Sequence, residues 1–128
     1  MTDEVYKELI LELNRQPLNK KVLNDFDIHH KENNPLCGDE IELFIKFDAD
    51  DKVADVGFQG AGCAIAQAST SLLTDYIKGK SKSELKNITA ETMTEMLGLP
   101  NLNPTRLRCL LLSLKVLQKG LSNETIEQ

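Results

Sequence analysis

The chain of 128 residues has a net charge of −5, with 41% hydrophobic and 27% charged residues, a balance typical of a globular domain that buries a core. The absence of a basic run argues against nucleic-acid binding, and no apolar run approaches the length of a membrane span. The acidic first residues also lack the apolar core of a signal peptide. We therefore expect a cytoplasmic protein of one domain, residues 1–128, with flexible ends at 1–4 and 122–128.

The first third of the chain predicts one helix, one weak strand and a turn. Apolar residues recur at helical spacing over residues 4–15, and Pro17 ends that run. A polar strand is predicted over about 27–32. The next segment, 33–39, is dense in Asn, Pro, Gly and Asp and predicts a turn.

A β-hairpin is the clearest prediction in the middle of the chain. From Glu40 to Phe47 apolar residues alternate with largely polar ones, as in a half-buried strand. A short acidic loop at 48–52 leads into a second strand, Val53 to Phe58, with Ala54 on the same face as Val56 and Phe58. The short connection makes the pair antiparallel.

Four helices follow the strands in the prediction. They are a helix over 64–76, a short helix capped by Ser81, a helix from Thr89 to Leu97, and a last helix from Pro104 to about Lys119 that Gly120 ends. Strands followed by a run of helices predict an α+β fold, in which helices cover one face of a small antiparallel sheet of about three strands.

The residues with the richest chemistry are the cysteines Cys37, Cys63 and Cys109, an odd number that does not suit a disulfide framework. Cys37 lies in the turn before the hairpin, and Cys63 follows its second strand. Antiparallel pairing brings these two positions to one edge of the sheet. Cys109 lies one turn into the last helix and can reach the same end of the domain. Asp39 is two residues from Cys37, across the permissive Gly38.

This set of side chains suits a soft metal site. Two or three thiolates with one carboxylate bind zinc tetrahedrally, and the same ligands suit iron–sulfur chemistry. Cys63 follows the glycines Gly60 and Gly62 and begins a helix, whose dipole favours a thiolate.

Simpler interpretations stay open for several of these residues. Cys109 is flanked by leucines and could be a core residue, and Asp39 could close an Asx turn. His29 and His30 are surface histidines or a spare ligand. Neighbouring arginines, Arg106 and Arg108, either lower the pKa of the Cys109 thiol or form the solvated side of the helix.

Three cysteine motifs in order make the chain resemble the iron–sulfur cluster scaffold family that includes IscU, SufU and the N-terminal domain of NifU. The resemblance covers about residues 5–120. The motifs are Asn34-Pro35-Leu36-Cys37-Gly38-Asp39, Gly60-Ala61-Gly62-Cys63-Ala64-Ile65-Ala66-Gln67-Ala68-Ser69 and Pro104-Thr105-Arg106-Leu107-Arg108-Cys109, the third in its SufU form.

The resemblance implies a scaffold rather than an enzyme. Such a protein accepts persulfide sulfur from a cysteine desulfurase, assembles a labile cluster, expected to be 2Fe–2S, and passes it to apo iron–sulfur acceptor proteins. It implies Cys37, Cys63 and Cys109 as ligands of a cluster, of iron or of zinc, with Asp39 as fourth ligand or tuner of release. The sulfur acceptor is Cys109 by analogy with IscU and Cys37 by analogy with SufU. A monomer or weak homo-oligomer is expected.

The chain departs from both the IscU pattern and the SufU pattern. Arg108 stands where IscU proteins carry a histidine, and Leu99-Pro100-Asn101-Leu102-Asn103 does not supply the chaperone-recognised Leu-Pro-Pro-Val-Lys motif. The chain also lacks the usual SufU insertion between the second and third cysteines. The alternatives are a zinc-bound sulfurtransferase partner that activates a desulfurase, and a protein whose zinc is only structural.

Overall fold

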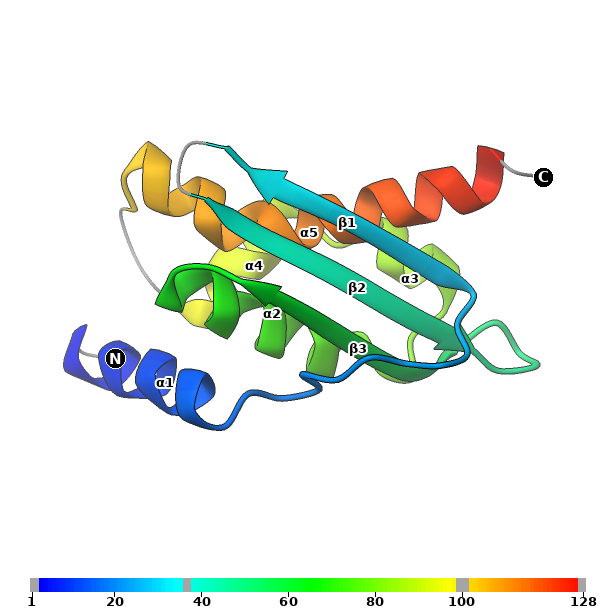
Figure 1. Ribbon diagram of the computed structural model, residues 1–128, viewed down its shortest axis with the longest axis horizontal. Coiled ribbons are helices and arrows are strands. Elements are labelled where there is room, and N and C mark those ends of the chain that lie inside the picture. Colours follow the sequence, from blue (N-terminus) through cyan, green and yellow to red (C-terminus); the bar gives the residue numbers. More distant parts are fainter. Residues whose placement is uncertain (1–2, 36–37, 99–101, 127–128) are drawn as a thin grey trace.

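The computed structural model describes residues 3–35, 38–98 and 102–126 (Figure 1). Within these residues, one helix precedes the strands and four follow them. In chain order the elements are α1 (Asp3–Arg15), β1 (Ile28–Asn34), β2 (Asp39–Phe47), β3 (Val53–Ala61), α2 (Ala64–Tyr76), α3 (Lys82–Lys86), α4 (Ala90–Leu97) and α5 (Pro104–Ile126).

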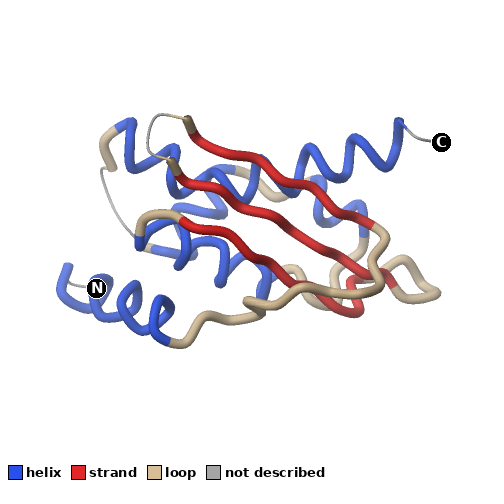
Figure 2. Tube along the Cα trace, in the orientation of Figure 1, coloured by secondary structure: helices blue, strands red, loops and turns tan. Residues whose placement is uncertain are grey.

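The three strands form one antiparallel sheet in the order β1-β2-β3, and the helices after β3 gather on one face of it (Figure 2). The predicted α+β fold is therefore confirmed. Ile41, Leu43 and Ile45 alternate along β2 and are at most 1% exposed, so the sequence pattern correctly identifies the strand face that enters the core. The helices α5 and α2 contribute most of the opposing layer, and α1 packs against α2. None of the described helices combines the length and apolar character needed to cross a membrane.

Both outer strands are longer than predicted. β1 extends to Asn34, so the predicted turn begins later, and β3 extends to Ala61. The prediction that Ala54 shares the buried face with Val56 and Phe58 is wrong, because Ala54 is exposed. The register shifts between Lys46 and Phe47, and this irregularity leaves Ala54 without a partner on β2.

The predicted caps of the later helices are confirmed. Ser81 and Thr89 each form a capping box with the residue three positions on, and Gly98 ends α4 in the left-handed region at φ 69°. Asn103 begins α5, where its side-chain oxygen accepts a hydrogen bond of 2.9 Å from the backbone N–H of Arg106.

The predicted end of the last helix at Lys119 is wrong, because α5 continues through Gly120 to Ile126. Gly120 is buried and faces β1. A Cβ atom there would lie 2.8 Å from Cγ2 of Ile28 and 3.3 Å from Cβ of His30. The glycine therefore does not end the helix. It lets α5 approach the sheet more closely than any larger residue allows.

We expect Gly120→Ala to lower the free energy of unfolding by about 1–2 kcal/mol. Overpacking against Ile28 costs about 1–3 kcal/mol, and the better helix propensity of alanine recovers up to about 1 kcal/mol. Urea unfolding of the variant, with the exposed Ser122→Ala as control, measures the effect. If the contact with Ile28 carried no cost, the better helix propensity of alanine would raise stability instead.

Candidate metal centre

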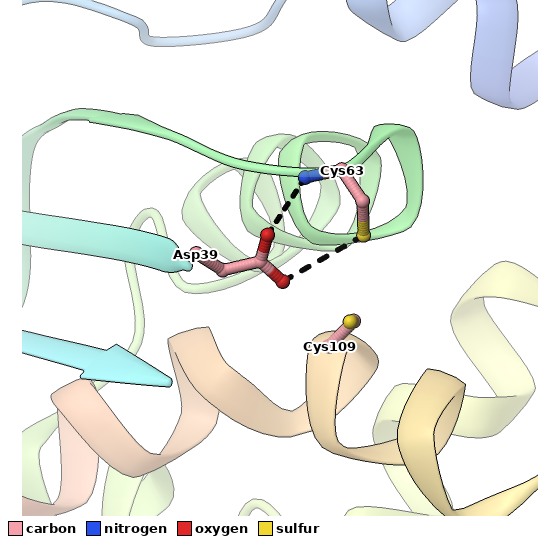
Figure 3. Close-up of side chains that lie close together, drawn as sticks. All are labelled: Asp39, Cys63 and Cys109. Atoms are coloured by element: carbon pink, nitrogen blue, oxygen red, sulfur yellow. Dashed lines mark hydrogen bonds between the residues drawn. The ribbon is translucent and has the colours of Figure 1, made fainter. Parts of the chain in front are cut away.

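Three of the predicted ligands converge at one end of the sheet (Figure 3). Ligand atoms of Asp39, Cys63 and Cys109 all lie within 4.8 Å of one another. Asp39 is the first residue of β2, Cys63 is the N-cap of α2, and Cys109 lies in the second turn of α5. The fourth predicted ligand, Cys37, lies outside the described residues.

The Asp39 carboxylate joins the start of β2 to the start of α2. Its Oδ1 accepts a hydrogen bond of 2.8 Å from the backbone N–H of Cys63, and its Oδ2 lies 3.7 Å from the Cys63 sulfur (Figure 3). The Asp39 residue is only 1% exposed. A buried carboxylate needs such partners, because burial of an unpaired charge is costly. The contact bridges segments 24 positions apart and aims the carboxylate at the thiol.

Two glycines make this approach possible. Gly60 has φ +145°, and a Cβ atom on it would lie 2.0 Å from the carbonyl oxygen of Glu40. A Cβ atom on Gly62 would lie 2.6 Å from Oδ1 of Asp39. Both distances are far below van der Waals contact. The end of β3 can therefore lie this close to Glu40, and the residue before Cys63 this close to Asp39, only with glycine at these positions.

Cys63 is the accessible member of the group. It is exposed, has an extended backbone (φ −68°, ψ 165°), and its side chain makes no capping hydrogen bond. The sulfur therefore stands at the N-terminal end of α2, where solvent and a partner can reach it.

Cys109 combines two roles that the sequence left as alternatives. Cys109 is 4% exposed and belongs to the hydrophobic core, as a structural cysteine would. Its sulfur nevertheless lies on the side of α5 that faces Cys63 and Asp39 (Figure 3). It is thus both a core residue and a candidate ligand.

The neighbouring arginines do not share the burial of Cys109. Arg106 and Arg108 are both exposed, which agrees with the prediction of a solvated helix side.

The sequence analysis missed Gln67 as a supporting residue. The side chain is 6% exposed, and its Nε2 donates a hydrogen bond of 3.3 Å to the carbonyl oxygen of Gly60. Its Oε1 accepts one of 3.1 Å from the Lys20 ammonium. Gln67 thereby connects the first turn of α2 to the end of β3. The sequence did offer one signal for this role, a polar residue on the buried side of a predicted helix.

Neither histidine joins the ligand group in the described part of the chain. The His29 ring stacks on Phe44 at 4.8 Å and hydrogen-bonds to the Glu42 carboxylate. With Gln59, this contact holds the pKa of the Glu42 carboxyl below its ordinary range. His30 lies 3.6 Å from the Glu32 carboxylate. Both histidines therefore interact with neighbouring side chains of the sheet. The interpretation of one of them as a spare metal ligand finds no support.

The donor set fits a soft or borderline metal ion. Two sulfurs and one carboxylate come from three different elements, and zinc takes such ligands in tetrahedral geometry. Thiolate ligands also suit iron–sulfur clusters. Because one ligand is exposed and two are buried, a bound metal would sit at the surface with one side open to partners.

Sequence comparison places the chain in a known family. Residues 5–126 match the model of the NifU-like N terminal domain. The chain belongs to this family. It is 36% identical to the zinc-dependent sulfurtransferase SufU of Bacillus subtilis over 95% of its own length and 92% of that protein. It is also 50% identical to the iron–sulfur cluster assembly scaffold protein IscU of Streptococcus pyogenes, over 50% of the chain and 39% of that protein.

Solved structures agree with this assignment. A SUF-system scaffold protein described as putative, from Fervidobacterium islandicum, superimposes with a TM-score of 0.77 at 32% identity, over 94% of this chain and 99% of that one. A NifU-like N-terminal protein from Brucella abortus gives a TM-score of 0.76 at 20% identity, over 98% of each chain, which shows the shared fold alone. The resemblance stated from the cysteine motifs is therefore confirmed.

We expect Gly62→Ala to weaken zinc binding by about tenfold or more, because the new methyl group displaces the carboxylate that orients Cys63. Competition with a chromophoric zinc chelator measures the affinity. The control is Gly79→Ala, far along the chain, which has φ +80° and open space around its Cβ position. That variant should lose stability and keep its affinity; equal affinities for both variants would contradict the role given to Gly62.

Proposed function

We propose that this protein is an iron–sulfur cluster assembly scaffold that accepts sulfur from a cysteine desulfurase, binds iron, builds a labile cluster and transfers it to apo-proteins. The observation that carries the proposal is the convergence of Asp39, Cys63 and Cys109, three family motif positions, within 4.8 Å at one end of the sheet. The scaffold names among the relatives support it.

In this proposal Cys37, Cys63, Cys109 and Asp39 are the ligands, and the cluster, of the 2Fe–2S type, is the cargo. A carboxylate among thiolates is a harder donor than a fourth cysteine and holds iron less tightly, which suits transfer. Cys63 gives the cargo an exposed edge, whereas Asp39 and Cys109 are anchored in buried positions.

The sulfur acceptor is Cys109 or Cys37, as the family analogies imply. Cys109 is 4% exposed, so a persulfide donor reaches it only after local opening of the site. Thiol exchange depends on access as well as on thiolate character.

A second function, a zinc-bound sulfurtransferase partner that activates a desulfurase, has a specific observation in its favour. The SufU of Bacillus subtilis, named zinc-dependent, aligns over 92% of its length, whereas the IscU of Streptococcus pyogenes aligns over 39% of its own. The ligand set also fits zinc. A third possibility, structural zinc alone, uses the same residues without sulfur transfer.

We further propose that the protein works in the cytoplasm. It is one domain over residues 1–128 and a monomer or weak homo-oligomer. Its partners are a cysteine desulfurase and apo iron–sulfur acceptor proteins.

Anaerobic reconstitution with iron, cysteine and a desulfurase tests these functions. Visible absorption from a thiolate-ligated cluster, followed by transfer to an apo-ferredoxin, is the expected result. Persulfide on one cysteine with zinc retained would favour the sulfurtransferase function. If no cysteine takes up sulfur, only structural zinc remains.

We expect Asp39→Ala to hold its cluster longer and transfer it more slowly than the wild type. The matched control is Asp39→Asn, whose amide oxygen keeps an acceptor for the Cys63 N–H and whose charge is lost. If the carboxylate is the labile ligand, both variants slow transfer. If only Asp39→Ala is altered, the residue acts through the hydrogen bond, and transfer at the wild-type rate in both would contradict any role in release.

A further inference from the structure

A pocket of about 310 Å³ lies between the end of β1 and the first half of α5. It is distinct from the ligand group, although Arg108 in its wall directly precedes Cys109. The volume is at the lower end of the range for small-molecule sites, roughly 300–1,000 Å³. The lining residues are Asn33, Asn34 and Pro35 from β1 and the following turn, and Arg108, Leu111, Leu112 and Lys115 from α5.

The α5 wall of this pocket has a cation at each end and an apolar centre. Positions 108, 111 and 115 are separated by three and four residues, so they form one stripe along the helix. Arg108 and Lys115 are exposed, and Leu111 between them is half-buried. Seven residues of helix separate the two cations by about 10 Å along the axis.

In the described parts of the chain neither Arg108 nor Lys115 forms a direct ion pair. The pKa of the Glu32 carboxyl is lowered first by its hydrogen bond from Lys119 and also by the charge of Lys115. Other lysines nearby are paired: Lys119 lies 2.8 Å from Glu32, and Lys31 lies 2.8 Å from Glu40. In a protein with a net charge of −5, two cations around one apolar pocket with no acidic residue in its lining make the local charge positive.

We propose that this pocket binds a small dicarboxylate with a short aliphatic body. Arg108 offers a planar fork of donors that matches one carboxylate, and Lys115 offers a point charge for the other. The aliphatic body of the ligand lies over Leu111, and the Asn33 amide can hydrogen-bond a carboxylate oxygen. The flexible arginine and lysine side chains span the gap between their helix positions and a four- or five-carbon ligand.

Both walls of the pocket adjoin the predicted metal centre. Asn34 pairs with Asp39 across the β1–β2 register, and Arg108 adjoins Cys109. The binding of a small acid at this place is independent of the proposed function.

Titration of the ¹⁵N-labelled full chain with succinate at pH 7, followed by amide chemical shifts, tests the binding. Saturable shifts are expected at residues 108–115 and at Asn33 and Asn34. The double variant Arg108→Gln/Lys115→Gln should bind about tenfold more weakly or worse, because it loses two charge-assisted hydrogen bonds. The control, Lys7→Gln/Lys86→Gln, changes the net charge equally on other elements and should bind as the wild type does.

Three outcomes would overturn the proposal. The first is the absence of saturable shifts at these residues, and the second is equal weakening in both double variants, which would indicate a general effect of net charge. The third is binding of acetate as tight as that of succinate, because it would show that one cation acts alone. Each readout is independent of cluster assembly, so failure here leaves the scaffold function untouched.

Discussion

The hydrogen bond from the Cys63 backbone to the buried Asp39 carboxylate is the contact on which the candidate site depends. It places a carboxylate and a thiol from segments 24 positions apart at one corner of the sheet. The bond exists because Gly62 carries no side chain where the carboxylate lies. It also compensates a carboxylate that is almost fully buried, which would otherwise oppose folding. The same interaction thus contributes to the fold and to the geometry of the site.

The β2–β3 hairpin and the last helix bring the ligand residues to this corner of the sheet. The register of β2 with β3 pairs Glu40 with Ala61, and so sets Asp39 beside the glycine turn. Cys109 arrives from the opposite layer, because α5 packs against β1 and β2. Gly120, three turns further along α5, allows that close packing. The position of a sulfur at one end of the helix therefore depends partly on a missing side chain near the other end.

Local patterns predicted most of the fold, and long-range packing explains what they missed. Alternation along β2 and the caps at Ser81, Thr89 and Asn103 identify elements through contacts of a few residues, which a sequence displays directly. The hairpin loop was enough to predict that Cys63 approaches Asp39. The role of Gly120 was missed because the sequence alone does not distinguish a glycine that ends a helix from a glycine that lets the helix pack closely against a strand. Gln67 was missed for a similar reason: its partners, Gly60 and Lys20, lie outside its own helix.

The distribution of burial over the three ligands bears on how the site exchanges its cargo. Asp39 and Cys109 are at most 4% exposed, and moving either would disturb the sheet or the core. Cys63 is exposed on a turn whose two glycines lack the side chains that would restrict its backbone. If the cluster is the cargo, the ligand that can move at least cost is Cys63, and the two others remain as a fixed base. A carboxylate that accepts the hydrogen bond of the Cys63 N–H and also binds the metal would hold the metal less tightly, because the N–H withdraws electron density from it.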